Sequence, residues 1–403
     1  MREGTKFLLG TSAVVMFAMP GAAQNLPTPA ATTPLAKVEV DILYDSNVAG
    51  SSAQLAAQRG IERADITFTP RLDVNYFKQL GADSAFLAAS AGYDFYQHNT
   101  LLNRERLDGV GGLNVRLADC DGTVQAAYAR HQTDLERLTV GTTTNTEQDI
   151  IGTVSGACNQ SGRLVPGFSV SQTWSTNSAA QLFSSNYKSL STQGSILYHQ
   201  PLIGDVTLFG QYQETEYPHR LFGLGTGTQQ DGYDTYAGGL KLEHRFGARL
   251  DLIVSVADTS VKSFSGISPD FNGITYDSSL SYQIGPRLTA TLEANRVTSP
   301  ANRPDTSYSV GELYSVHADY QAGTALKVGI GASDSRQSYA GAALVPGVDI
   351  AKESVKSFFV RGGYNITQNL SVNLGVFQDQ RHADVVGYSY TSSRVSLSVS
   401  QAF

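Results

Sequence analysis

Apolar and polar residues alternate one by one along most of this chain. In residues 65–76 the apolar positions are Ile66, Phe68, Leu72, Val74 and Tyr76, and polar residues occupy most of the positions between them. Residues 288–294 repeat the pattern, and such segments recur about every twenty residues. A period of two gives the two faces of a β-strand different environments. The pattern therefore predicts many two-faced strands.

The last nine residues, Val395 to Phe403, carry this alternation to an aromatic C-terminus. This ending resembles the C-terminal recognition strand of bacterial outer-membrane β-barrels, which the barrel-assembly machinery reads. The resemblance implies an assembly signal formed by Val395, Leu397, Val399 and Phe403, with that machinery as a partner. On this stretch alone, the terminal strand of a soluble β-sandwich is the alternative.

Short connections that contain Gly, Pro, Asn or Asp alternate with longer ones, such as those near 218–231 and 298–307. Counting the segments predicts about eighteen strands, with about sixteen as the alternative. An even number places both termini and the short turns on the periplasmic side, and the longer connections outside. The sequence thus predicts an all-β fold over residues 37–403, a transmembrane antiparallel up-and-down β-barrel of the bacterial outer-membrane type, with no second domain.

Composition agrees with a barrel rather than a helical protein. Among 403 residues, 41% are hydrophobic, and 39 Gly and 20 Tyr stand against one Trp and three Met. The formal net charge of −7 argues against a nucleic-acid partner.

The N-terminus has the features of a secretory signal peptide over residues 1–23. Arg2 and Lys6 precede an apolar stretch, and Gly21, Ala22 and Ala23 form a small-residue cleavage site. Residues 24–36 are rich in Pro and Ala and are expected to form a periplasmic linker. We therefore expect secretion through the inner membrane and integration into the outer membrane, among its lipids and lipopolysaccharide.

A barrel of about eighteen strands leaves an aqueous channel, so the polar faces of its strands form the expected functional surface. Positive and negative residues are nearly balanced there, which predicts a polar passage without selectivity for one sign of charge. The alternative is that each charge only pairs with a neighbour and solvates the wall. The pore-lining candidates are Asp65, Arg71, Asp73, Asp94, Lys241, Glu243, Arg245, Arg287, Glu293, Lys327, Arg361 and Arg394.

No pattern typical of an enzyme appears. The seven His residues are scattered, and neither an HExxH motif nor paired-Cys ligand spacing occurs. His317 and Asp319 lie two residues apart on one face, a spacing common by chance. We therefore expect no catalytic residue, cofactor or metal site. Inward aromatic residues such as Tyr96, Phe209 and Phe377 could stack on sugar rings, or could simply fill the lumen.

The only two cysteines are Cys120 and Cys158. They fall at the two ends of one predicted hairpin, and antiparallel register places Cys120 opposite approximately residue 161. Thiols this close in the oxidising periplasm usually pair, so we predict a disulfide. The alternative is two free thiols on opposite faces.

The first hairpin adds a family resemblance. Tyr44-Asp45-Ser46-Asn47-Val48, a Ser- and Gln-rich connection, and Thr69-Pro70-Arg71-Leu72 resemble the opening of the putative β-barrel porin type-2 family. The resemblance implies a conduit for a secreted exopolysaccharide and a periplasmic polysaccharide-export protein as partner. It brings no catalytic residues.

Three functions remain open: polysaccharide-export porin, general or substrate-specific diffusion porin for small solutes, and structural or adhesive surface barrel. Diffusion porins commonly fold one long loop inward as a constriction. No connection in this sequence stands out as such a loop, which favours export.

Overall fold

The computed structural model of the chain describes residues 34–133, 144–159, 162–224, 227–264, 268–303, 306–341 and 350–403. The predicted signal peptide, residues 1–23, lies outside the described residues, as does the predicted linker up to residue 33. Both stay predictions.

Eighteen antiparallel strands form one closed sheet, which confirms the predicted barrel and its strand number. The strands are β1 (Ala36–Asp45), β2 (Asp65–Leu80), β3 (Asp83–Tyr96), β4 (Arg104–Leu117), β5 (Cys120–Gln132), β6 (Thr146–Cys158), β7 (Leu164–Asn177), β8 (Tyr187–Gln200), β9 (Gly204–Leu224), β10 (Gly227–Phe246), β11 (Leu250–Ser263), β12 (Phe271–Ile284), β13 (Leu288–Arg303), β14 (Thr306–Ala322), β15 (Leu326–Ala340), β16 (Lys352–Asn365), β17 (Leu370–Ala383) and β18 (Tyr390–Ala402).

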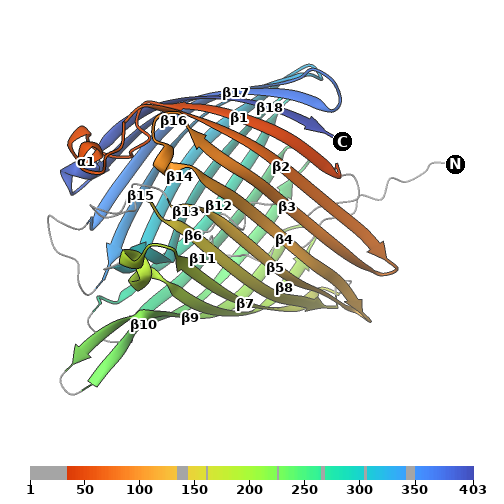
Figure 1. Ribbon diagram of the computed structural model, residues 1–403. Coiled ribbons are helices and arrows are strands. Elements are labelled where there is room, and N and C mark those ends of the chain that lie inside the picture. The colour runs from red at the N-terminus through yellow and green to blue at the C-terminus, as the bar shows by residue number, and fades with distance from the viewer. Residues whose placement is uncertain are drawn as a thin grey trace.

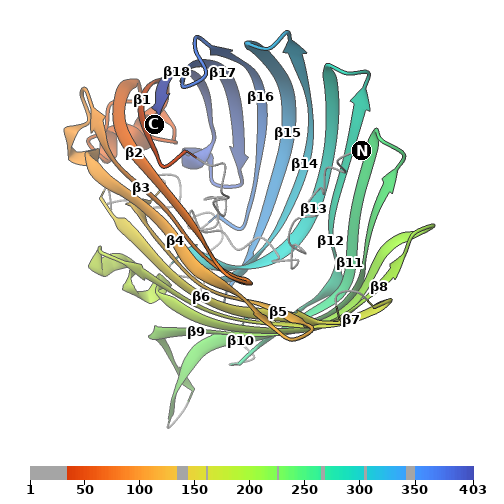
Figure 2. The same cartoon turned by 90° about the vertical axis from the view of Figure 1, so that its right-hand side faces the viewer.

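The barrel closes because the first strand pairs with the last. Each strand is hydrogen-bonded to its neighbours in sequence, and β1 pairs with both β2 and β18. The seam runs from Lys37 opposite Ala402 to Asp45 opposite Arg394. Closure satisfies the backbone groups that an open edge would leave unpaired in lipid. Figures 1 and 2 show the strands inclined around a common axis.

Exposure alternates along the strands in the sense opposite to that of a soluble protein. In β2, Phe68 and Leu72 are 43% and 45% exposed, whereas Thr67 between such positions is buried. Exposed apolar side chains form the outer, lipid-facing wall, so the residues between them face the lumen. Outward aromatic residues gather near both ends of the strands, such as Tyr44 at one end and Tyr364 at the other, as expected of two interfacial belts.

The two ends of the barrel differ. At one end, where both termini of the barrel lie, strands join through short turns such as 81–82 and 247–249. Gly81 has φ +71°, a conformation that side-chain-bearing residues rarely adopt. By the expected polarity this turn end is periplasmic, and the other end, the outer mouth, carries the longer connections.

Two predicted connections are wrong. Residues 218–231 and 298–307 were expected to be loops, but β9 and β10 continue as paired strands to Leu224 and from Gly227, and β13 and β14 to Arg303 and from Thr306. In both hairpins the two strands stay hydrogen-bonded to each other beyond the ends of the neighbouring strands. This pairing satisfies backbone N–H and C=O groups that would otherwise have to bind water. The β9–β10 hairpin projects furthest in Figure 1.

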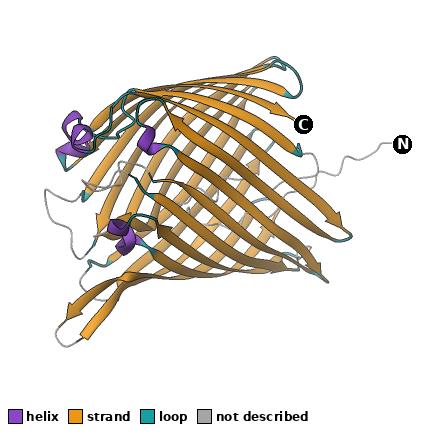
Figure 3. Cartoon of the chain, in the orientation of Figure 1, coloured by secondary structure: helices purple, strands orange, loops and turns teal. Residues whose placement is uncertain are grey.

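Short helices occur only at the outer mouth among the described residues (Figure 3). They are α1 (Ala53–Gln58), η2 (Thr100–Leu102), η4 (Ala180–Ser185) and η5 (Val386–Tyr388). The Ser52 hydroxyl accepts a hydrogen bond from the Leu55 backbone N–H and caps α1. In the described part of the chain, none of the helices has the length and apolar character needed to cross a membrane.

A disulfide joins Cys120 and Cys158 at the turn end, with an S–S distance of 2.06 Å. The two residues are directly opposite each other in β5 and β6. The expected partner position of Cys120, near residue 161, is three residues away from Cys158, because the exact register depends on turn geometry that alternation does not reveal.

Candidate functional site

The predicted pore-lining charges fall on the inward positions of their strands, except for Arg287, which lies in the turn before β13. Three of them are nevertheless buried: Asp65 at 2%, Asp94 at 6% and Lys241 at 6% exposure. Alternation identifies the face of a strand, but neighbouring side chains decide whether an inward residue reaches open lumen. The open-lumen role predicted for these three residues therefore does not fit the structure.

Asp65 holds a loop in place. Its carboxylate accepts hydrogen bonds from the backbone N–H groups of His98 at 3.1 Å and Asn99 at 2.8 Å. These bonds anchor the connection between β3 and β4. Asp94 is similarly occupied, because it accepts from the Thr69 hydroxyl at 2.7 Å and from Arg106 Nη2 at 3.1 Å.

Around β1 and β2, inward charges of opposite sign pair closely. Arg71 Nη2 lies 2.5 Å from Glu39 Oε1, and Lys37 Nζ lies 2.9 Å from Asp73 Oδ2 and 2.6 Å from Glu39 Oε2. The Ser90 hydroxyl donates to Asp73 at 2.7 Å. This network neutralises its own charge, so it gives the wall a polar surface without a strong field of one sign.

Pairing continues around the barrel. Glu243 Oε1 lies 2.7 Å from Lys241 Nζ, and Arg245 Nε lies 2.5 Å from Asp251 Oδ1 near the turn end. Glu293 accepts from the Ser315 hydroxyl at 2.9 Å. The remaining candidates, Lys327, Arg361 and Arg394, lie on the wall formed by β15 to β18 and also face carboxylates.

The outer mouth is crossed by connections that pack on one another. Ala56 and Ile61, from the β1–β2 connection, pack with Leu102 of η2 and Leu182 of η4 in one buried cluster. Leu55 on the other side of α1 packs with residues of the β15–β16 and β17–β18 connections. The tip of the β13–β14 hairpin comprises residues 301–303 and 306–307. We call this tip, together with the set of connections described above, the mouth cover.

Arg220 fastens the β13–β14 tip to the β9–β10 hairpin. Its Nη1 donates to Asp231 Oδ2 and to the Thr306 carbonyl, both at 3.0 Å. Its Nη2 donates to the Arg303 carbonyl at 3.0 Å, and its Nε to the Ser184 carbonyl of η4 at 3.1 Å. The side chains of Arg220 and Asp231 are 7% and 0% exposed. Because β11 and β12 separate β10 from β13 in the sheet, these contacts bridge the outer ends of those two strands.

Tyr217 completes the attachment. Its ring centroid lies 4.1 Å from the Arg220 guanidinium carbon, and its hydroxyl donates to the Ser307 carbonyl and accepts from the Ala301 N–H at 3.1 Å. The Ser307 hydroxyl donates to Asp231 at 3.0 Å. A bulge at residues 218–220 of β9 turns Arg220 into this site, since the pairing with β10 skips from Tyr217 to Leu221.

A second ion network ties the far side of the same hairpin to β16 and β17. Arg303 lies over the Tyr339 ring at 4.3 Å and 3.6 Å from Glu353. Glu353 accepts from the Tyr339 hydroxyl at 2.7 Å and from Arg381 Nε at 3.1 Å. The hairpin is thus held from both sides, and the mouth cover is an interlocked layer.

The motif of the first hairpin is structural. Asn47 is 2% exposed and donates through its amide to the carbonyls of Ser51 and Thr391, at 3.0 and 3.5 Å. Asp45 accepts from the Asn47 N–H at 2.7 Å and from the Ser392 hydroxyl. The motif therefore closes the outer end of the β1–β18 seam and supports the start of α1.

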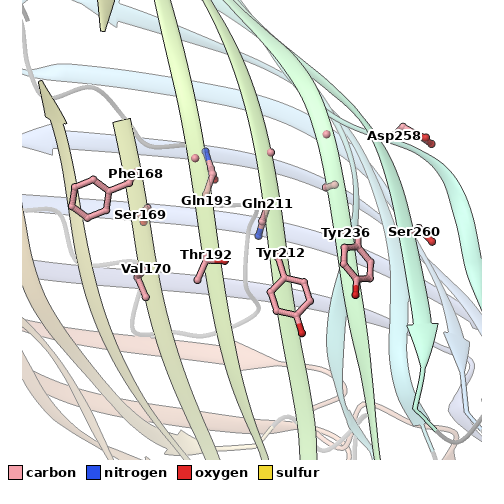
Figure 4. Close-up of a pocket in the computed structure, with 14 residues that line it drawn as sticks. Phe168, Ser169, Val170, Thr192, Gln193, Gln211, Tyr212, Tyr236, Asp258 and Ser260 are labelled. Carbon is pink, nitrogen blue, oxygen red and sulfur yellow. The ribbon is translucent and has the colours of Figure 1, made fainter. Parts of the chain in front are cut away.

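A hollow of about 740 Å³ lies on the outer wall over β7 to β11 (Figure 4). Its floor is a row of glycines, in which Gly210 pairs with both Gly194 and Gly238, and Phe168 and Tyr236 stand at its sides. These residues share the outward positions of their strands, whereas Gln193 and Gln211, which also line the hollow, occupy the inward ones. The outward part of the hollow faces lipid, where acyl chains can fill it.

Chemically, the lumen offers hydrogen-bonding groups and paired charges. Within the described ranges, no group of three or more His, Cys, Asp or Glu side chains is arranged to hold a metal ion. His317 Nε2 and Asp319 Oδ2 are 4.0 Å apart, and Asp319 also faces Arg361. The arrangement suits passage of a polar solute or polymer.

Comparison with known proteins supports this fold. The family described as "Putative beta-barrel porin 2" matches residues 260–403, and over these residues the predicted family resemblance is confirmed. The FrpB iron transporter (F3-3 variant) from Neisseria meningitidis has 7% identity and a TM-score of 0.51, with 87% of this chain covered. This chain spans about 63% of the length of that FrpB structure.

OccK2 (OpdF) from Pseudomonas aeruginosa, in complex with glucuronate, has 12% identity and a TM-score of 0.49, and covers 91% of this chain and 98% of its own. No curated protein matches this chain in sequence. Identities this low show the fold alone. In fold, the barrel is of the outer-membrane porin and transporter type.

Proposed function

We propose that this chain forms an outer-membrane conduit for the export of a secreted exopolysaccharide. The observation that carries the proposal is the porin type-2 likeness, which appears in the Tyr44–Val48 motif of the first hairpin and again as the family match over residues 260–403. The fold supplies a continuous polar inner wall along which such a polymer can move.

The lumen chemistry supports a large hydroxylated cargo. Inward charges occur as pairs, such as Arg71 with Glu39 and Arg361 with Asp319, so they do not act as a ladder that concentrates ions of one sign. A polysaccharide exchanges hydrogen bonds with such a wall at each step. None of these contacts singles out one small ion as the cargo.

The proposed partners follow from the same assignment. A periplasmic polysaccharide-export protein would deliver the chain to the turn end, and lipids and lipopolysaccharide would surround the exposed apolar wall. The barrel-assembly machinery would read the last strand, where Val395, Leu397, Val399 and Phe403 are all exposed on the outer face.

A diffusion porin for small solutes is the second candidate. No long inward loop was expected from the sequence, but Arg220 holds the β13–β14 tip on the inner side of the β9–β10 hairpin, across the outer ends of β11 and β12. An inward element of this kind is what a diffusion porin uses to set its pore size. The missing constriction loop therefore no longer favours export. The proposal of export depends instead on the likeness to the porin type-2 family.

Deletion of the gene tests the choice. We expect the deletion strain to lose surface or released exopolysaccharide and to take up sugars and amino acids at the normal rate. Complementation with the intact chain should restore secretion. Normal secretion combined with slowed nutrient uptake would instead establish the diffusion porin.

A further inference from the structure

Two phenyl rings lie side by side on the inner wall of β16 and β17. The centroids of Phe359 and Phe377 are 6.2 Å apart, with 35° between the ring planes. Both side chains are partly exposed. Other inward rings, such as Phe86 and Phe209, are only 4% exposed and form part of the packed wall.

Glycines let the two rings lie close to the backbone. A Cβ atom at Gly331, which pairs with Phe359, would come within 2.4 Å of the Phe359 ring. A Cβ atom at Gly375 would come within 2.6 Å of the Phe377 ring. Glycine in a strand interior often marks such a close approach. The rings are therefore laid along the wall and turn a face towards the lumen.

Planar charged groups accompany the rings. The guanidinium carbons of Arg361 and Arg394 lie over the rings of Phe359 and Phe377, respectively, each 5.4 Å from the ring centroid. Arg361 Nη2 lies 3.1 Å from Asp319 Oδ1, which fixes the orientation of its guanidinium. Half of the Arg361 side chain remains exposed, so some of its donors can also reach a ligand.

The second arginine is held in the same way. Arg394 Nη2 lies 2.6 Å from Asp379 Oδ2, and Asp379 also accepts from the Ser357 hydroxyl at 2.6 Å. Neighbouring inward positions carry small residues, including Ser333 and Ser396. The result is a low shelf of two phenyl rings, two fixed guanidinium groups and carboxylate acceptors.

We propose that this aromatic–arginine shelf is a pyranose-binding subsite in the lumen. One face of a pyranose ring presents C–H groups that can stack on a phenyl face, and its hydroxyl groups hydrogen-bond to planar guanidinium and carboxylate groups held beside it. Arg and Asp together supply donors and acceptors at fixed spacing, as vicinal hydroxyls require. The inference rests on the proposed function, in that the bound sugar would be a unit of the exported polymer.

Current block by sugar in planar lipid bilayers tests the subsite. The full chain is reconstituted, and maltohexaose is compared with a polyethylene glycol of similar size, which blocks a pore without presenting sugar rings. In the variant Phe359→Leu/Phe377→Leu, apolar volume is kept but the flat ring faces are lost. We expect the residence time of maltohexaose to fall about tenfold, with unchanged open-pore conductance and unchanged block by polyethylene glycol.

Phe86→Leu is the matched control, because Phe86 is also an inward ring laid over a glycine, Gly112, but is buried in the wall of β3 and β4. We expect it to leave the maltohexaose residence time unchanged. An equal loss in the control, or wild-type block in the double variant, would overturn the subsite. So would a wild-type channel that maltohexaose blocks no longer than polyethylene glycol does. If the deletion strain secretes polymer normally while the double variant loses sugar block, export is refuted and the subsite stands.

Discussion

Replacing Arg220 by Ala should release the β13–β14 tip from the mouth cover without unfolding the barrel. The substitution leaves Asp231, which is 0% exposed, without its ionic partner, and removes hydrogen bonds to the carbonyls of Ser184, Arg303 and Thr306. Breaking one side of a buried ion pair costs about 3–5 kcal/mol. The lipid-embedded strands do not depend on these contacts, so the cost falls on docking of the tip.

The free-energy cost of Arg220→Ala can be measured as a change in the rate of thiol labelling. At about 1.4 kcal/mol per factor of ten, a cost of about 3–5 kcal/mol raises the undocked population by roughly a hundredfold to a few thousandfold. Ala301 in the tip is 3% exposed, and Ala301→Cys would create the only free thiol among the described residues. Because labelling requires undocking, its rate with an impermeant maleimide should rise by this factor until it reaches that of an exposed thiol.

Arg336→Ala is the control. Arg336 also pairs with a carboxylate, Asp334, at 2.9 Å, but its side chain is 59% exposed, and exposed pairs contribute little. Its removal should leave labelling unchanged. The double variant Arg220→Ala/Asp231→Ala should label more slowly than Arg220→Ala alone, because no uncompensated charge remains buried. Labelling of Arg220→Ala at the parent rate, with a correctly inserted barrel, would refute the role assigned to Arg220.

Three further outcomes are expected. Deleting Phe403, which is 69% exposed at the end of the barrel, should leave precursor in the periplasm; full recovery of heat-modifiable, membrane-inserted protein would contradict an assembly signal there. Alkylation under denaturing, non-reducing conditions should label neither Cys120 nor Cys158 in the mature protein, and labelling of both would exclude the disulfide. Asn47→Ala should cost about 1–3 kcal/mol, because the buried Ser51 carbonyl loses its donor; this would appear as a lower temperature for loss of the heat-modifiable form, and an unchanged temperature would contradict the seam role.

The barrel itself could be predicted from the sequence because each strand faces lipid on one side and the polar lumen on the other. Apolar and polar residues therefore alternate with a period of two. Phe68 and Leu72 meet lipid while Thr67 does not, and this contrast repeats through every strand. Since each strand pairs with its neighbour in sequence, finding the turns is enough to give the topology. Strand number, closure and the facing of Arg71 or Arg361 all follow from these local facts.

The burial of inward side chains and the register of the strands could not be predicted in the same way. Asp65 and Lys241 occupy inward positions, yet both are buried. The loop at His98 and Asn99 binds the Asp65 carboxylate, and Lys241 Nζ pairs with Glu243. The register of the hairpin that contains Cys120 differs by three residues from the expected one. Both depend on packing between side chains that the alternation does not encode.

Arg220 shows why the mouth cover was missed. Counted from Tyr212, which is on the outer face, an even-numbered residue such as Arg220 should face outward. The bulge at residues 218–220 reverses this, and only then does the guanidinium meet Asp231. No composition signal marks such a bulge, although Pro218 is a hint, since proline in a strand is confined to edges and irregular positions.

The mouth cover also bears on the choice between export and diffusion. A permanently open barrel of eighteen strands would let small solutes through whether or not polymer is present. A cover held by a few buried polar contacts can be displaced, since the bonds from Arg220 to the Arg303 and Thr306 carbonyls are lost as soon as the tip moves. An export conduit gains from this, because the arriving polymer can replace the tip. A diffusion porin instead needs the tip to stay, as the element that sets its pore size. Loosening the tip by Arg220→Ala should therefore raise small-solute entry in both cases, but only an export conduit will continue to secrete polymer through the altered mouth.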